Sequence, residues 1–204
     1  MKRVTIAFIA FMTLFCGVIK AQDLRTLFIE MPDTLQPLLT NNDRRDMIDF
    51  WDARMSTPVV NRLDGKSRIT ELTNDFLSVE LSRSSSMQIK MLNNVAGDTL
   101  LCIVNTVGAE AYDSRIHFYN SRWERVDGSK FTMPSIADFF LPSDSVGKAL
   151  EVSDIYLVKL SLKADNDSLK AEYTMPLYMS RSDSARVAPQ LRPLFYRWTG
   201  KRFE

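Results

Sequence analysis

The chain has 204 residues, of which 45% are hydrophobic, and its 26 basic and 25 acidic side chains leave a formal net charge of +1. Charges of both signs are interspersed without a long run of either, which excludes nucleic acid as a favoured partner. With one histidine and two cysteines, the chain lacks the ligands for a two-histidine metal site or a thiolate cluster, so no metal or cofactor is expected.

The first residues have the organisation of a secretory signal peptide. Lys2 and Arg3 precede the uncharged residues 4–19, and Ala21 supplies a small residue for cleavage. The apolar run is short for a transmembrane helix, which needs about 20 apolar residues. We therefore expect export to the periplasm or the outside of the cell, with residues 1–21 removed and no transmembrane segment remaining.

A lipoprotein cleavage before Cys16 is the alternative processing route. It is disfavoured because Phe15 is bulky at a position where such sites take a small residue. Cleavage after Ala21 leaves Cys102 as a single thiol, which cannot form an internal disulfide. The mature chain must therefore be held by a hydrophobic core, and its length suffices for one domain or two small ones.

Two amphipathic helices are predicted at the start of the mature chain. The first covers residues 24–31 and is stopped by Pro32; the second follows Asn41 and Asn42 as N-caps and ends at residues 56–58. The second helix has an apolar stripe formed by Met47, Ile48, Phe50, Trp51 and Met55. Its other stripe is expected to face water and carries Asp43, Asp46, Asp49 and Asp52.

From residue 76 onward the period of the apolar residues changes to two, which predicts strands. The expected strands are residues 76–81, 87–91, 99–104, 115–119 and a short 123–126. Short turns between them favour an antiparallel meander. Residues 99–104 are apolar on both faces, which predicts a central position in the sheet.

A second, smaller cycle of elements is predicted over residues 133–204, after a first part of residues 22–132. It comprises a brief helix at 134–140, a strand pair at 154–163 and 168–178 joined at 165–167, and a closing segment at 194–203. The fold class is therefore α+β, with antiparallel meanders and short helices packed on one face. Similar aromatic hairpin ends at 118–126 and 195–203 suggest two degenerate α-plus-β repeats; the alternative is one continuous domain.

No residue is assigned a catalytic role. His117 lies in a strand between apolar neighbours, and Cys102 lies in an apolar strand, where an inert buried thiol is expected. Gly65, Lys66 and Ser67 resemble the end of a phosphate-binding loop, but Val60 replaces its leading glycine, so a turn is predicted.

Aromatic side chains near the two hairpin ends are the candidate binding residues: Trp123, Trp198, Tyr119 and Tyr196. Partly exposed rings at such ends stack on sugars or anchor a protein partner. The alternative interpretation is that these rings cap the core at the edge of the sheet, since aromatic residues are favoured in strands.

Five triplets consist of aspartate, then serine or threonine, then a small or aliphatic residue. They resemble the acceptor sequence of the general protein O-glycosylation of exported proteins in Bacteroides-type bacteria. The candidate acceptors are Thr34, Thr99, Ser145, Ser168 and Ser184. Asp-Ser and Asp-Thr pairs also occur after turns because aspartate bonds to the backbone there, which is the competing explanation.

The segments 31–39, 45–49 and 113–119, together with Trp123, resemble a family of exported Bacteroidales proteins of unknown function. The resemblance implies a small domain of the cell envelope and transfers no functional residue. We therefore expect a non-enzymatic domain that binds a protein or glycan of the envelope. The alternative is a small extracytoplasmic hydrolase that uses carboxylates from different strands.

The signal sequence gives a direct prediction about the mature protein. Because Ala21 suits cleavage and Phe15 disfavours processing at Cys16, the N-terminus should be Gln22 without lipid. Intact mass and N-terminal sequencing of the protein purified from its native envelope measure this. A lipidated Cys16 at the N-terminus would contradict it.

Overall fold

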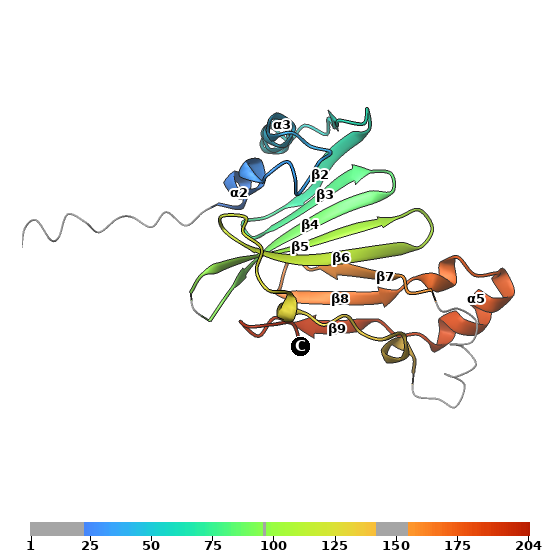
Figure 1. Ribbon diagram of the computed structural model, residues 1–204. Coiled ribbons are helices and arrows are strands. Elements are labelled where there is room, and N and C mark those ends of the chain that lie inside the picture. Colours follow the sequence, from blue (N-terminus) through green and yellow to red (C-terminus); the bar gives the residue numbers. More distant parts are fainter. Residues whose placement is uncertain (1–22, 96, 142–154) are drawn as a thin grey trace, which may run out of the picture.

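A computed structural model describes residues 23–95, 97–141 and 155–204. The predicted signal peptide, Cys16 and the candidate acceptor Ser145 lie outside these residues. The described chain forms two antiparallel sheets with short helices, which confirms the predicted α+β class (Figure 1). Within these ranges, no helix has the length and apolar character needed to cross a bilayer.

The larger sheet is a six-stranded meander in which the strands lie side by side in sequence order. Its strands are β1 (Val59–Val60), β2 (Lys66–Leu72), β3 (Phe76–Ser82), β4 (Ser85–Asn93), β5 (Thr99–Gly108) and β6 (Tyr112–Asn120). The meander predicted from residue 76 onward is confirmed, but β1 and β2 were not predicted. Lys66 and Ser67 begin β2 rather than continuing a turn. Buried and exposed residues alternate at the start of β2, but one of its two buried residues is Ser67, so the sequence shows no apolar alternation.

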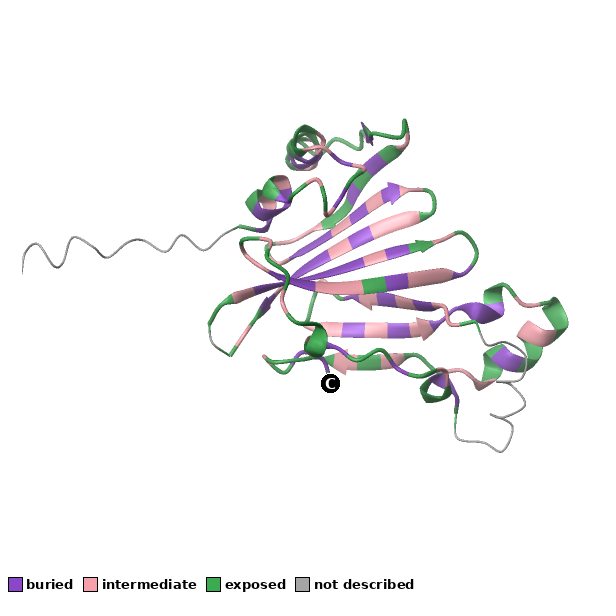
Figure 2. Ribbon diagram, in the orientation of Figure 1, coloured by how far each residue is buried: buried purple, intermediate pink, exposed green. Residues whose placement is uncertain are grey.

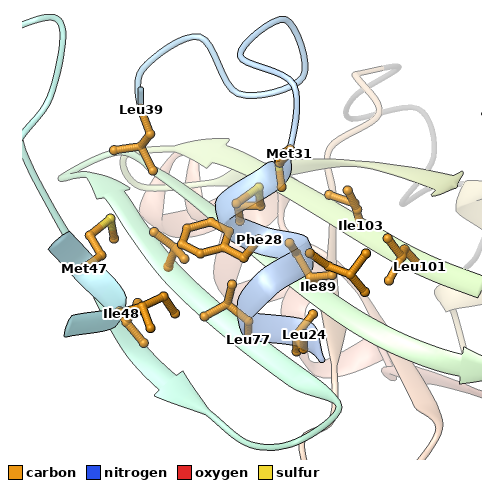
Figure 3. Packing of buried hydrophobic residues seen from close by; sticks show 14 of the residues in the cluster. Leu24, Phe28, Met31, Leu39, Met47, Ile48, Leu77, Ile89, Leu101 and Ile103 are labelled. Atoms are coloured by element: carbon orange, nitrogen blue, oxygen red, sulfur yellow. The ribbon is translucent and has the colours of Figure 1, made fainter. Parts of the chain in front are cut away.

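Two helices, α2 (Leu24–Glu30) and α3 (Asn41–Asp52), cover one face of this sheet, which we call the front face. Phe28 and Leu27 of α2 and Met47 of α3 pack on strand residues such as Leu77 and Ile89 (Figure 3). This cluster is the first of two large cores. It confirms that the N-terminal helices pack on one face of the meander.

The N-cap of α3 differs from the prediction. Thr40 is the cap rather than Asn41 or Asn42: its hydroxyl accepts the Asp43 N–H at 3.1 Å, and its own N–H donates to the Asp43 carboxylate at 2.7 Å. This reciprocal capping box satisfies two backbone donors at once, whereas a single asparagine side chain would satisfy one.

A buried arginine holds the connection between the two helices. Arg44 is 1% exposed, and its guanidinium donates to the Ile29, Met31 and Leu39 carbonyls and to Asp33 at 3.0 Å. The carbonyls of Ile29 and Met31 lie at the end of α2, where intrahelical donors are lacking. Arg44 therefore ends α2 and fixes its position relative to α3.

The opposite, back face of the large sheet is covered by a three-stranded sheet of β7 (Val158–Leu162), β8 (Ser168–Tyr173) and β9 (Leu194–Arg197). Cys102 and Val104 of β5 pack there on Leu160 and Leu169 in the second core. Buried and intermediate residues alternate along β7 and β8, and intermediate and exposed residues alternate along β9, whereas β5 is buried continuously from Leu100 to Val104 (Figure 2). The apolar residues 100–104 are buried on both faces, but β5 is the fifth of six strands, with one neighbour on each side, rather than a central strand.

Three side chains of the large sheet bond to the backbone of β7. Its N–H groups at Val158, Leu160 and Leu162 donate, respectively, to Asp113 at 3.5 Å, Ser114 at 2.9 Å and Gln88 at 2.9 Å. The edge of the small sheet is therefore closed by polar groups of its neighbour.

A buried lysine also joins the two sheets. Lys90 of β4 is 2% exposed, and its ammonium lies 2.8 Å from Asp75, 3.1 Å from the Ala164 carbonyl and 3.7 Å from Asp167. Burial acts to raise the pKa of Asp75, but hydrogen bonds from Lys90 and Thr73 and the charge of Lys90 outweigh it and lower this pKa.

The two sequence halves share the second core and differ in their order of elements. After β8, which ends at Tyr173 rather than at 178, the chain forms α5 (Arg181–Val187) and two 3-10 turns before β9. The strands from β2 to β6 follow one another without such an insertion. Both similar hairpin ends exist, with bridges between Tyr119 and Arg125 and between Trp198 and Phe203. These matching ends are therefore local structures and do not extend to two equivalent halves.

The Lys90–Asp75 pair predicts unequal effects of removing its two partners. Asp75→Asn leaves the buried ammonium of Lys90 with weaker partners and should lower the free energy of unfolding at pH 7 by more than about 1 kcal/mol. Lys90→Met should lower it by less, because water can hydrate the half-exposed carboxylate of Asp75. Since the folded pKa of Asp75 is lowered, its contribution is present above an unfolded pKa of about 3.9 and is lost as the pH falls through the folded value.

Urea unfolding of the wild type and both variants between pH 7 and pH 3 measures this. The difference between wild type and Asp75→Asn should shrink below about pH 4. A difference that stays constant over this range would contradict the role given to the Asp75 charge.

Candidate functional site

Two of the four predicted binding residues lie in the core. Trp198 is 8% exposed, and its indole N–H donates to the Asn93 carbonyl at 2.7 Å. Its ring stacks on that of Phe118 with a centroid distance of 6.4 Å and meets the Phe203 ring edge-on with a centroid distance of 5.3 Å. Tyr119 is also buried. The expectation of exposed rings is therefore wrong for these two residues, because Trp198 packs on the large sheet at Phe118 and Asn93 and Tyr119 lies within the first core.

Trp123 and Tyr196 are partly buried and belong to different cores. Trp123 packs on the first core beside Tyr119 at 5.9 Å, and its backbone adopts a φ of +63°. Tyr196 packs on the second core against Phe131 at 5.1 Å, and burial, followed by the charge of Asp138, raises its pKa. The four aromatic residues thus lie on opposite faces of the large sheet and form no common surface.

His117 and Cys102 lie in strands β6 and β5 of the large sheet. Burial lowers the pKa of His117, and the charges of Arg125 and Arg115 lower it further. Cys102 is fully buried as predicted, and burial raises the pKa of its thiol well above the usual range. In the part of the chain that the structure describes, no three His, Cys, Asp or Glu side chains gather where they could hold a metal ion.

Aspartates of three candidate glycosylation triplets have structural roles. Asp33 pairs with Arg44 and Arg62, and Asp167 lies near Lys90. Asp183, in the first turn of α5, accepts a hydrogen bond from the hydroxyl of the N-cap residue Ser180. Of the described acceptors, Thr34 is exposed in the connection between α2 and α3, whereas Thr99, Ser168 and Ser184 are half-buried. Modification remains a prediction, and Thr34 is the most accessible of these acceptors.

A surface hollow lies between α3 and β2, and we call it the α3–β2 groove. Its volume is about 730 Å³. It is lined by Met47, Phe50, Trp51, Asp52, Arg54, Met55, Ser56, Thr57, Arg68, Ile69 and Thr70. Apolar and aromatic side chains form one part of this lining, and hydroxyl and charged groups form the rest.

The end of α3 creates this groove. The helix ends at Asp52, earlier than predicted, because Arg54 adopts a left-handed φ of 56° and turns the chain away. The Arg54 N–H donates to the Trp51 carbonyl at 3.0 Å and the Met55 N–H to the Phe50 carbonyl at 2.8 Å, which is a Schellman motif. Met55 therefore leaves the predicted apolar stripe and is 51% exposed.

Charges around the groove are unevenly paired. Asp52 forms an ion pair with Arg25 at 3.2 Å, and Arg68 forms one with Glu80 at 2.8 Å. Arg54 has no ion pair among the described residues. The groove therefore offers one unpaired cation beside an apolar lining. The position of Arg54 directly after the helix is unusual for an arginine. It becomes visible only when the helix end is known, and the sequence pattern predicted that end at residues 56–58.

Comparison with known proteins gives a family and a fold. The model of a family described as "Protein of unknown function (DUF3256)" matches residues 17–203. Among solved structures, the chain is similar to a domain of an uncharacterized protein from Porphyromonas gingivalis W83, with 24% identity, a TM-score of 0.76 and coverage of 89% of this chain and 96% of that chain. At this identity the likeness shows the fold alone. No curated protein matches the chain.

The left-handed conformation of Arg54 has a measurable cost. Arg54→Gly should raise the free energy of unfolding by about 0.5 to 1 kcal/mol. Glycine adopts the left-handed conformation without strain, and its larger loss of conformational entropy on folding offsets part of that gain. Urea unfolding measures the change. Arg54→Ala is the control and should leave the stability nearly unchanged; a clear loss in that control would show that the arginine side chain stabilises the fold.

Proposed function

The chain belongs to this family of unknown function, and we propose that it is a non-enzymatic binding domain of the cell envelope whose protein partner occupies the α3–β2 groove. Membership confirms the resemblance inferred from the sequence. The observation that carries the proposal is a partly buried apolar lining with the exposed Met55 beside an unpaired arginine. Tryptophan and arginine are the residue types that dominate the binding energy of protein interfaces.

The size and composition of the groove suit this role. Binding pockets typically enclose about 300 to 1,000 Å³ and combine apolar walls with a few polar groups. The groove lies within that range and has hydroxyl groups at Ser56, Thr57 and Thr70. Met55, an adaptable side chain, stands at its rim and is exposed to solvent in the free chain.

A protein partner fits this lining better than a glycan. Sugars are usually held by an open aromatic face with several polar groups around it, whereas Phe50 and Trp51 are partly buried against the first core. The exposed thioether of Met55 and the apolar Ile69 favour an apolar side chain of the partner.

The geometry gives less support to a hydrolase. Hydrolysis by carboxylates needs two of them facing one another across the reacting bond. Asp52 is the one carboxylate among the described lining residues of the groove, and it is paired with Arg25. The groove thus favours binding over acid–base catalysis.

Export is the second part of the proposal. Its support is the arrangement of Lys2, Arg3, the apolar residues 4–19 and Ala21, which lie outside the described residues. A partner in the periplasm or outside the cell follows from it.

Affinity capture from the native envelope fraction tests the groove. The double variant Arg54→Glu/Met55→Gln changes the unpaired cation and the exposed methionine, and should reduce recovery of the specific partner at least about tenfold relative to wild type. The matched control is Arg83→Glu/Val107→Gln, since Val107 is 56% exposed and both residues lie away from the groove. Equal capture by the wild type and the groove variant would contradict the proposal, and a carbohydrate partner would contradict its protein assignment.

A further inference from the structure

One strand edge beside the groove has no partner. β1 pairs with β2 at two positions, Val59 with Ser67 and Val60 with Lys66, although β2 continues to Leu72. Among the described residues, no strand pairs with the outer edge of β2 beyond Ser67.

The direction of the backbone groups on this edge follows from the hairpin. The Asn61 N–H donates to the Gly65 carbonyl at 2.8 Å, so these two residues form a hydrogen-bonded pair. Hydrogen-bonded pairs recur every second residue, and the next such pair is Val59 with Ser67, whose backbone N–H and C=O therefore point toward β1. Backbone groups alternate along a strand, and the N–H and C=O of Ile69 therefore point to the same edge, where β1 no longer lies.

The groove occupies the place where β1 would continue. Extending the β1–β2 register by two residues would set Thr57 opposite Ile69. Instead Pro58, which has no N–H, and the Schellman end of α3 carry the chain away from β2. Thr57 and Ile69 both line the groove.

Polar contacts occupy parts of three other strand edges, on β6, β7 and β9. Side chains of the large sheet accept the N–H groups of β7, as described above. On β6, Thr174 accepts the Tyr112 N–H at 3.0 Å and donates to the Tyr112 carbonyl at 2.6 Å. On β9, Arg197 and Glu204 exchange backbone bonds at 2.7 and 3.0 Å. Along β2 beyond Ser67, by contrast, no strand of the described chain pairs with the edge that borders the groove.

We propose that an extended segment of the partner protein adds to the edge of β2 as a further strand. It pairs with the backbone at Ile69, places an apolar side chain against Phe50, Trp51 and Met55, and presents an acidic residue to Arg54. This inference rests on the proposed function and specifies its mode. Strand addition is a recurring way to bind extended peptides, with affinity from main-chain bonds and specificity from side-chain pockets.

Features of β2 limit the length of the added strand. The pairing of β2 with β3 shifts register between Ile69 and Glu71, and such a bulge bends an edge strand. Lys66, Arg68 and Glu71 place charges along the same strand and disfavour pairing with arbitrary chains. The occupant is therefore a short segment of a few residues.

A library of linear peptides displayed on phage, selected against the mature chain, is the probe. Enriched peptides should carry an acidic residue near an apolar one. Their affinity should be at least about tenfold lower for the groove variant Arg54→Glu/Met55→Gln and unchanged for the control variant Arg83→Glu/Val107→Gln. Failure to obtain any peptide sensitive to the groove variant would overturn both the groove proposal and this inference.

Backbone methylation of a selected peptide separates the two proposals. N-methyl groups at alternate residues should reduce affinity at least about tenfold, with little effect at the residues between, and the Ile69 amide should gain hydrogen-exchange protection on binding. If binding depends on the groove but shows neither the alternating effect of N-methylation nor protection of the Ile69 amide, strand addition is wrong. The proposed function would still hold in that case. A dimer of the free chain that protects Ile69 would overturn strand addition as well, by assigning the edge to a second copy.

Discussion

The burial of β5 on both faces is the constraint from which the architecture follows. A strand that is apolar on both sides is stable only as part of a middle layer, so each face of the meander must be covered. Helices α2 and α3 provide one cover and the sheet β7–β9 the other. The polar groups at the second interface, Lys90 above all, are tolerated because each has a bonding partner in the opposite layer.

Coverage declines toward the start of the meander. The small sheet packs mainly on β4 to β6, and only α3 reaches β2 on the front face. Where α3 ends at its Schellman turn, the cover ends with it, and the groove and the open edge of β2 result. The surface proposed for binding is therefore a consequence of how far one short helix extends, together with the strained Arg54 that terminates it.

Local patterns identified most of the elements but not the way in which they pack. Alternation over residues 76–119 predicted β3 to β6, because each strand has an apolar face in its own sequence. It missed β2, whose buried face includes Ser67 bonded to Asn61 and the Leu81 carbonyl. Burial of Trp198 depends on Asn93 and Phe118, which are distant in sequence, so no local pattern could show it. The groove was missed because Met55 has the spacing of a core residue and is displaced by the backbone of Arg54.

The contact between Trp198 and Asn93, made across 105 residues, also determines when this fold can form. Phe203 completes the same aromatic cluster, so the back layer closes only after nearly the whole described chain is available. Until then the apolar back face of β4 to β6 stays uncovered, and contacts of such long sequence separation form slowly. During synthesis from the N-terminus, the second core therefore stays incomplete until β9 and Phe203 are available, and over that interval the uncovered apolar face favours aggregation.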